Sequence, residues 1–473
     1  MRRLLLPALL IYFVILGRAG YQSVTLDEAD AFNNFSAQSL ELAFYPSSGN
    51  HVLNSLLARF STQAFGMSQF TMRLPAMLGA ALYLLAVASI VTRVAPTRRL
   101  LGFAILTCNP FMLDYLVAAR GYSLALGLLA CAVALAMRIL EDDPPRKILH
   151  SVAISLCIAL SLAANFSFAF SLIATASAFL LIAYLRMPLK TWLAITAATA
   201  LPGLLLTYAL VGETLREYPR AQLYFGAETW VEMWNEMAEA LFPRTNISVT
   251  AFDLEPILTR LHPIAAYAIL IPIAIGLWTV IRTNSPALRL VWLALALTLT
   301  AHGLAHAIQG LLLPLDRTSI FIAFFLGIAI ISAPPNAIAR TIATAILCST
   351  LLIFAVAFRT TYFRIWEFDL DLNRGFDAIA AYAKDHSLET VGCTWRYGGG
   401  YNFYRAASHG SVPECDTVDQ DNPAPRSAYF VITPWQDEFI ARKKLHIIYK
   451  GPQSGLVVGI SPAVQSEDAP TNK

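Results

Sequence analysis

The stretch from Leu74 to Val94 reads LPAMLGAALYLLAVASIVTRV, and its first charged side chain is Arg93. A helix needs about 20 mostly apolar residues to cross the hydrocarbon of a membrane, and this stretch supplies them. The whole chain has the same character, because 57% of its 473 residues are hydrophobic and 14% are charged. Soluble domains carry about 25% charged residues. We therefore expect an α-helical polytopic membrane protein.

About eleven stretches of the chain have the length and hydropathy expected of a membrane span. They are residues 4–20, 74–94, 100–115, 122–140, 148–164, 166–185, 192–211, 263–281, 290–308, 319–332 and 342–358. The first stretch follows Met-Arg-Arg, and no good cleavage site lies behind it. We expect an uncleaved span there and not a signal peptide.

The basic residues predict the orientation of these spans, since Lys and Arg accumulate in short cytoplasmic loops. With Arg2 and Arg3 inside, every connection on the same side is basic. These connections are residues 93–99, 146–147, 186–190, 282–289 and 340. The short outer connections hold little beyond Arg120 and Arg317. We expect a multi-pass protein of the cell inner membrane with a cytoplasmic N-terminus and a periplasmic C-terminal domain.

A shift in charge predicts the domain organisation. Charged residues are nearly absent from long stretches before Phe358 and dense from Arg359 onward. We predict a transmembrane catalytic domain over residues 1–358 and a soluble extracytoplasmic α/β domain over residues 359–473.

Two predicted outer loops are long, residues 21–73 and 212–262. Loops of this length are usually functional or disordered, and these two are too rich in aromatic and apolar residues to be disordered. We expect short helices at the membrane interface, one of them over residues 229–241.

The tail after Arg359 alternates two patterns, which predicts its small α/β fold. The patterns are helical over residues 376–384 and 401–407, and strand-like over residues 390–393, 428–432 and 445–449. The run from Gly398 to Gly400 lacks the spacing of a dinucleotide loop, so we expect a flexible turn. Cys393 and Cys415 share this tail, and an oxidising compartment would allow a disulfide between them.

A carboxylate cluster follows the first predicted span. Residues 25–30 read Thr-Leu-Asp-Glu-Ala-Asp, so Asp27 and Glu28 lie close to the point where the chain leaves the membrane. Carboxylates at a membrane surface are often simply solvated. The functional alternative is a general base, or a group that binds a cation or a hydroxyl, at the lipid boundary.

Several ordered motifs resemble a known superfamily. The pair Asp27-Glu28 is followed by a segment with His51, then by Phe65-Gly66-Met67-Ser68, and then by Arg73-Leu74-Pro75 at the entry to the second span. This order resembles the GT-C superfamily of membrane glycosyltransferases, and within it the protein O-mannosyltransferase and aminoarabinose transferase family (glycosyltransferase family 39-like). The resemblance is firmest over residues 4–140 and implies a GT-C-like fold.

The resemblance also implies roles for single residues. Asp27 matches the family's proposed base for the acceptor hydroxyl, and Glu28 is its neighbour. Arg120, in a segment similar to the family's Arg-x-Tyr motif with Tyr122, matches the arginine that meets the lipid phosphate. Arg317 is similarly placed near the carrier, although Thr318 replaces the family's tyrosine.

His51 and Arg73 complete the predicted site. His51 stands where relatives have His-Pro-Pro, but Val52 and Leu53 follow it here. The resemblance places His51, Tyr122 and Arg73 among the substrate-binding residues. It names no metal ligand or other cofactor, and it leaves open whether a divalent cation is needed, since some GT-C relatives use one.

The chemistry of sugar transfer fits these residue types. Breaking the bond between the anomeric carbon and a carrier phosphate leaves an anion, which a guanidinium binds bidentately. A carboxylate takes the proton of the attacking hydroxyl. We expect a glycosyltransferase that moves a hexose or pentose from a polyprenyl-phosphate carrier to a lipid, glycan or protein acceptor on the outer face, amid membrane lipids.

Two other classes compete with this interpretation. A lipid or sugar transporter or flippase would show midplane charges, paired broken helices or two similar halves, of which the sequence shows few signs. An assembly protein would use the tail as a binding module. Nucleic acid is excluded as a partner, because the net charge is only +3 and no basic run carries interleaved aromatics.

Overall fold

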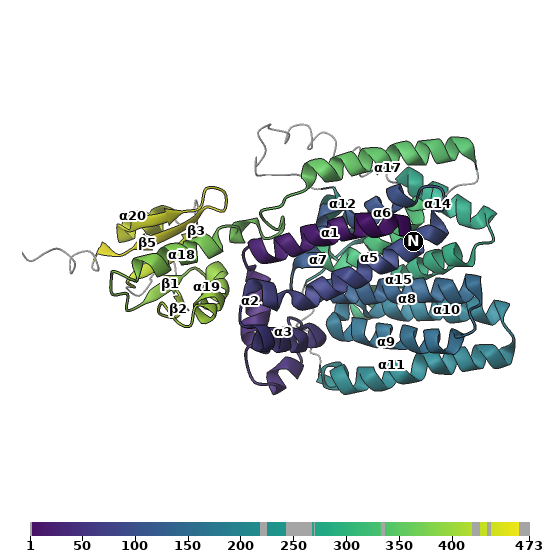
Figure 1. The fold of residues 1–473 in the computed structure, drawn as a ribbon, viewed down its shortest axis with the longest axis horizontal. Helices are drawn as coiled ribbons and strands as arrows, with labels where there is room; N and C mark the ends of the chain where they lie inside the picture. The colour runs from purple at the N-terminus through teal and green to yellow at the C-terminus, as the bar shows by residue number, and fades with distance from the viewer. Residues whose placement is uncertain are drawn as a thin grey trace, which may run out of the picture. The chain divides into compact units, whose positions relative to one another are not determined.

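The computed structural model describes residues 2–217, 225–242, 267–268, 270–332, 336–418, 426–432 and 437–462 (Figure 1). The chain divides into two compact units. The bundle unit consists of Met1–Gly17, Ala43–Asn54 and Pro75–Phe358. The loop-tail unit consists of Arg18–Leu42, Ser55–Leu74 and Arg359–Lys473, so it joins most of the first predicted outer loop to the tail. The boundary that the sequence predicts after Phe358 remains a proposal.

The bundle unit is helical. Its long helices are α1 (Arg2–Tyr21, up to Gly17), α5 (Leu74–Val94), α8 (Tyr122–Asp142), α9 (Lys147–Ala164), α10 (Ala169–Arg186), α11 (Leu189–Glu217), α15 (Pro286–Gln309) and α17 (Ala337–Ala357). Shorter ones are α6 (Arg99–Thr107), α7 (Pro110–Val117), α12 (Trp230–Leu241), α14 (Leu270–Arg282) and α16 (Ile320–Ile331). Helices α8, α9 and α11 run side by side, as do α10 and α15 (Figure 1).

The predicted membrane fold is confirmed. Within the described ranges, eight helices are long and apolar enough to cross a membrane, or up to nine if one bent pair counts as a span. All eleven stretches predicted from the sequence contain helix, but α14 and α16 have only 13 and 12 residues. The predicted number of spans therefore stays a prediction. Part of the stretch 263–281 lies outside the described residues.

The stretch predicted as one span over residues 100–115 is broken. It forms α6 and α7, which are bent by 61° relative to each other. Asn109 caps α7, because its side chain accepts hydrogen bonds from the N–H groups of Phe111 and Met112. Pro110 then occupies the first turn, where its missing N–H costs nothing. The Asn-Pro pair thus starts a new helix inside an apolar run.

Glycine allows α5 and α8 to touch. A Cβ added to Gly127 would lie 2.3 Å from the carbonyl oxygen of Gly79, and one added to Gly79 would lie 2.4 Å from the backbone of Ser123. Small residues permit such close backbone contact between membrane helices. This crossing fixes the first turn of α8, where Tyr122 lies.

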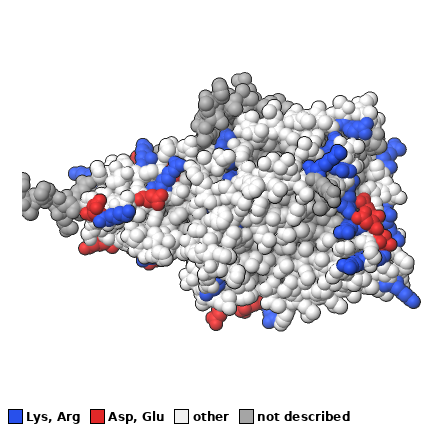
Figure 2. All heavy atoms as spheres, in the orientation of Figure 1, with Lys and Arg blue, Asp and Glu red and all other residues white. Residues whose placement is uncertain are grey.

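Several predicted cytoplasmic connections lie at one end of the bundle unit, where polar contacts link them. Arg93, at the end of α5, lies 2.6 Å from Asp142 at the end of α8. Arg98, before α6, donates to the carbonyl oxygen of Ser332 after α16. In Figure 2 the visible face of the helices is largely uncharged, and Lys and Arg gather at one end of them. Which side of the membrane this end faces stays a prediction.

The loop-tail unit contains a five-stranded sheet in the order β2-β1-β3-β5-β4. Its strands are β1 (Val391–Cys393), β2 (Cys415–Thr417), β3 (Ala428–Ile432), β4 (His446–Lys450) and β5 (Leu456–Ile460). β1 pairs in parallel with β2 and β3, whereas β5 is antiparallel to β3 and β4. The expected small α/β fold is confirmed. The sequence did not predict β2, which is short, or β5, which is buried along its whole length and so lacks the usual alternation.

Helices from the loop and from the tail belong to the same unit. They are α2 (Leu26–Ala31), α3 (Val52–Phe65, from Ser55), α4 (Gln69–Met72), α18 (Leu372–Tyr382), α19 (Trp395–Ala407) and α20 (Asp437–Lys443). Cys393 and Cys415 form a disulfide that joins β1 to β2. The predicted helix over residues 229–241 is also present, as α12 of the bundle unit, with Thr229 as its N-cap.

The expectation of a flexible turn at Gly398–Gly400 is wrong, because these residues lie inside α19. A Cβ added to Gly399 would lie 2.4 Å from an oxygen of Asp30, and one added to Gly400 would lie 2.2 Å from Leu372. The glycines therefore permit close packing of α19 against α2 and α18. Their value here is the missing side chain and not backbone freedom.

Candidate active site

The predicted carboxylates lie at the start of α2. Thr25 is its N-cap, and the Thr25 hydroxyl accepts a hydrogen bond from the N–H of Glu28 at 3.2 Å. The Glu28 carboxylate accepts one from the N–H of Thr25 at 3.0 Å. This reciprocal capping box explains why the sequence Thr-Leu-Asp-Glu begins a helix. Asp27, one residue earlier, is partly exposed.

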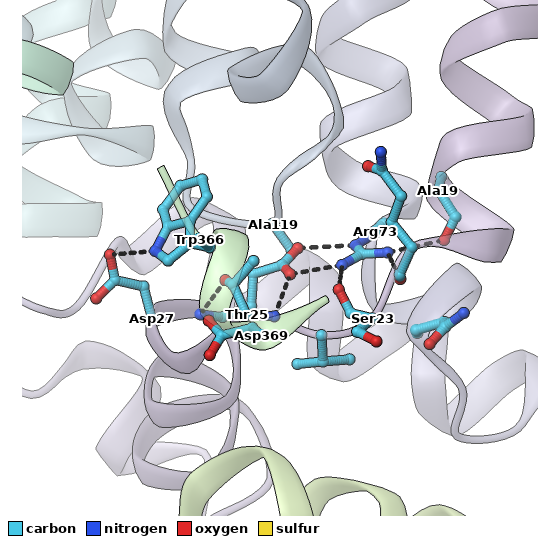
Figure 3. Close-up of polar contacts among 12 residues, drawn as sticks. Ala19, Ser23, Thr25, Asp27, Arg73, Ala119, Trp366 and Asp369 are labelled. Carbon is cyan, nitrogen blue, oxygen red and sulfur yellow. Dashed lines mark hydrogen bonds and ion pairs between the residues drawn. The ribbon is translucent and has the colours of Figure 1, made fainter. Parts of the chain in front are cut away.

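Glu28 is enclosed with Arg73. The Arg73 Nε donates to one Glu28 carboxylate oxygen at 2.8 Å, and Nη2 donates to the other at 2.7 Å. Both side chains are fully inaccessible to solvent. The other Arg73 bonds reach the carbonyl oxygens of Ala19 (3.1 Å), Gln22 (2.7 Å) and Ser23 (2.7 Å). Arg73 thereby satisfies carbonyl groups at and just beyond the end of α1 (Figure 3).

Asp27 meets the first residues of the tail. The indole N–H of Trp366 donates to the Asp27 carboxylate at 3.2 Å (Figure 3). Next to it, the carboxylate of Asp369 accepts a hydrogen bond from the N–H of Leu26 at 2.8 Å. Both tail side chains are buried. Asp27 is thus the accessible member of the predicted carboxylate pair, and it has a defined partner.

Burial raises the pKa of Asp369 to about 7. The hydrogen bond from Leu26 and the charge of Arg396 oppose this shift, while the charges of Asp27 and Glu28 add to it. The nearest atoms of Arg396 and Asp369 are 3.6 Å apart. Asp369 is therefore a buried carboxyl group that can hold a proton near neutral pH.

In the bundle unit, the loop that carries Arg120 has a fixed conformation. Gly121 has φ +72°, and a Cβ there would lie 2.1 Å from the carbonyl oxygen of Ala164, so only glycine fits. The side chain of Asn54 donates to the carbonyl oxygen of Ala119 at 3.0 Å. Arg120 itself is 8% exposed. Its position is thus set by backbone contacts on both sides.

His51 lies near this loop, and the charge of Arg317 also acts on it. Its ring packs edge-on against Tyr122 with centroids 5.9 Å apart. Burial lowers the pKa of His51 well below its ordinary value, and the positive charges of Arg120 and Arg317 lower it further. The structure therefore brings together four residues predicted for the site. We call His51, Arg120, Tyr122 and Arg317 the cationic cluster.

The ring of His51 is buried, and its nitrogens lack hydrogen-bond partners. The side chain is 6% exposed, and among the residues that the structure describes neither ring nitrogen has a hydrogen-bond partner. Buried polar groups in proteins are nearly always hydrogen-bonded. A neutral imidazole on which the charges of Arg120 and Arg317 act is chemically suited to contact an anion.

Asp27 belongs to the loop-tail unit and the cationic cluster to the bundle unit. The predicted opposition of Asp27 and Arg120 therefore stays a prediction. In the part of the chain that the structure describes, no group of three or more His, Cys, Asp and Glu residues is arranged to hold a metal ion.

The sequence interpretation did not predict Trp366 and Asp369. Both belong to the stretch Trp366-Glu-Phe-Asp-Leu-Asp371, which begins eight residues after Phe358, the end of the last predicted span. The available signal was the alternation of acidic and apolar residues in a segment that begins a soluble domain. Nothing local in that pattern identifies Asp27 as the partner.

The bundle of apolar helices, followed by a small sheet domain, is also the fold of a solved protein, ArnT. The GT-C-like fold implied by the sequence resemblance is thus confirmed.

The likeness rests on one solved structure. ArnT from Cupriavidus metallidurans bound to undecaprenyl phosphate matches at a TM-score of 0.52 and 13% identity, over 96% of this chain and 97% of that one. The apo form matches at a TM-score of 0.40 and 11% identity, over 96% of each chain. No family model matches the sequence, and no curated protein is significantly similar to it.

Proposed function

We propose that this protein is a glycosyltransferase that moves a sugar from a polyprenyl-phosphate carrier to an acceptor on the outer face of the inner membrane. The fold of ArnT supports the class of enzyme. The cationic cluster is the observation that carries the proposal, because it gathers the groups that a lipid-linked phosphate requires.

The cluster suits a phosphate in both charge and hydrogen bonding. Arg120 and Arg317 supply permanent positive charge and forked donors. His51 is kept neutral by burial and by these two charges, so one ring nitrogen is a donor and the other an acceptor. Leaving a buried donor unsatisfied costs about 1–3 kcal/mol, which a phosphate oxygen would offset.

The proposed reaction uses Asp27 as the general base. The acceptor hydroxyl oxygen attacks the anomeric carbon, and its proton passes to the Asp27 carboxylate. The bond from the anomeric carbon to the phosphate oxygen breaks, and its electron pair stays on the carrier phosphate, which Arg120 stabilises. Glu28 and Arg73, which are bonded to each other, hold the loop in this proposal and do not meet the substrate.

Two observations support the proposed orientation. The disulfide between Cys393 and Cys415 favours an oxidising compartment for the tail, as the periplasm is. Basic residues of several predicted cytoplasmic connections share one end of the bundle unit, as expected if that end faces the cytoplasm.

The test is transfer by the purified full-length protein. Radiolabelled undecaprenyl-phosphate pentoses, hexoses and aminoarabinose are incubated with the protein and a membrane extract, and the labelled product is identified. We expect transfer by the wild type and by Arg340→Ala, a control that removes an exposed arginine. Arg120→Ala should lose the activity.

The rival transporter function predicts a different outcome. In vesicles that contain the protein, the labelled carrier lipid would cross the bilayer and no label would reach an acceptor. That result would overturn the proposed transferase.

A further inference from the structure

We infer that the turn from Trp366 to Asp369, at the start of the tail, positions Asp27 for catalysis. The inference rests on the proposed function, in which Asp27 is the base. It assigns to the tail a direct part in the active site, through one hydrogen bond to the Asp27 carboxylate and one to the backbone beside it.

The first contact orients the carboxylate. Trp366 is 4% exposed, and its ring packs edge-on against Phe363 with centroids 5.8 Å apart. Its indole N–H donates to Asp27 at 3.2 Å. An indole nitrogen is only a donor, so it can hold the carboxylate without competing for the proton of the acceptor.

The second contact fixes the backbone next to Asp27. The Asp369 carboxylate accepts a hydrogen bond from the N–H of Leu26, the residue before Asp27. That N–H belongs to the first turn of α2, where no partner exists within the helix. Since α2 has only six residues, its own hydrogen bonds give Asp27 little rigidity.

Both contacts come from one rigid turn. The N–H of Asp369 donates to the carbonyl oxygen of Trp366 at 3.0 Å, and residues 367–369 form a 3-10 turn. Two anchors three residues apart therefore hold two consecutive residues of α2. A tail that merely packed against the loop would not need a donor directed at its accessible carboxylate.

Asp369 is a positioning residue and not a second base. At 1% exposure it cannot reach an acceptor. The charged groups that act on it are Asp27, Glu28 and Arg396. Glu28 is fully enclosed with Arg73, so Asp27 remains the carboxylate able to exchange a proton with a substrate.

The first test is Trp366→Phe, which keeps an aromatic ring and removes the donor. We expect kcat to fall about tenfold while KM for the donor sugar is unchanged. The acid limb of the pH profile should move to higher pH, because the lost hydrogen bond stabilised the ionised carboxylate. Trp395→Phe, at a position that is 63% exposed in the same unit, is the control. A wild-type kcat and acid limb in Trp366→Phe would overturn the inference.

The second test separates the acceptor oxygen of Asp369 from its charge. Asp369→Asn keeps an oxygen for the N–H of Leu26 and should stay within about threefold of the wild-type kcat, whereas Asp369→Ala should lose about tenfold. Asp377→Ala, at an exposed position on α18, is the control. Equal losses in the Asn and Ala variants would contradict positioning through this hydrogen bond.

A third measurement needs no activity. The indole N–H signal of Trp366 is identified in ¹⁵N-tryptophan-labelled protein by its loss in Trp366→Phe. It should shift in Asp27→Ala and not in Asp30→Ala, which removes another carboxylate from α2. An unchanged signal in Asp27→Ala overturns the inference whatever the activity. If Asp27→Ala shifts the signal but the wild type transfers no sugar, the proposed function is overturned and the contact remains supported.

Discussion

Two buried polar regions of this protein contrast in how their charges are satisfied. Glu28 and Arg73 meet in a bidentate ion pair, and further Arg73 bonds reach backbone carbonyl oxygens. His51 is also buried, and the charges of Arg120 and Arg317 act on it, yet its ring nitrogens have no partner among the described residues. The hydrogen-bonded pair Glu28 and Arg73 is suited to stabilise the fold. The ring nitrogens of His51, which lack such partners, are suited to bind a ligand.

The largest effect should come from breaking the satisfied pair. Arg73→Ala leaves Glu28 buried and unpaired and removes the bonds at the end of α1. We expect a loss of about 3–5 kcal/mol in the free energy of unfolding. Thermal unfolding of the purified protein measures it, and Arg340→Ala is the control. Stability equal to the wild type would show that Arg73 does not hold the loop.

Asp369 is an intermediate case, because it is buried but only partly bonded. Its folded pKa, about 7, lies above the ordinary value of 3.8. The folded state therefore binds the extra proton, and this stabilisation is complete below about pH 4 and is lost as pH rises toward 7. Between pH 5 and 7 the wild type should lose on the order of 2 kcal/mol that Asp369→Asn does not lose. Unfolding curves at several pH values measure it. Parallel pH dependence in the two proteins would mean that Asp369 stays ionised.

Arg120→Ala should weaken binding of undecaprenyl phosphate about tenfold or more, since hydrogen bonds to charged groups contribute about 1.5–3 kcal/mol. Its unfolding temperature should change little. Titration of the purified protein with the lipid phosphate measures the affinity. Unchanged affinity would remove the cationic cluster from the proposed mechanism.

The smallest effect should be a gain. His51→Phe keeps a planar ring against Tyr122 and removes the unsatisfied nitrogens, so the free protein should be as stable as the wild type or about 1 kcal/mol more stable. Phosphate binding should weaken at the same time. A loss of stability would show that the ring nitrogens of His51 have hydrogen-bond partners in solution. His51 would then not differ from Glu28 and Arg73 in this respect.

The sequence predicts what depends on local pattern. The helical stretches follow from apolar runs, and β3 follows from the strand-like pattern of residues 428–432. The break between α6 and α7 was also a local signal, Asn109-Pro110, that the apolar run concealed.

What the sequence could not predict depends on distant partners. Glu28 and Arg73 are 45 residues apart, and Asp27 and Trp366 are 339 residues apart. A resemblance of motifs carries residue types and not their burial, so the roles that it assigns to Glu28 and Arg73 stay predictions. The glycines of α19 were misread because the side chains of α2 and α18, distant in sequence, are what require them.

The hydrogen bond from Trp366 to Asp27 can form only late in biosynthesis. Asp27 leaves the ribosome early, and its partner follows 339 residues later. At about 5–20 residues per second, that interval is roughly 20–70 s. Nascent chains should therefore carry Asp27, the proposed base, without this hydrogen bond until Trp366 has left the ribosome. If the proposed function holds, a chain interrupted before the tail should be inserted in the membrane but inactive.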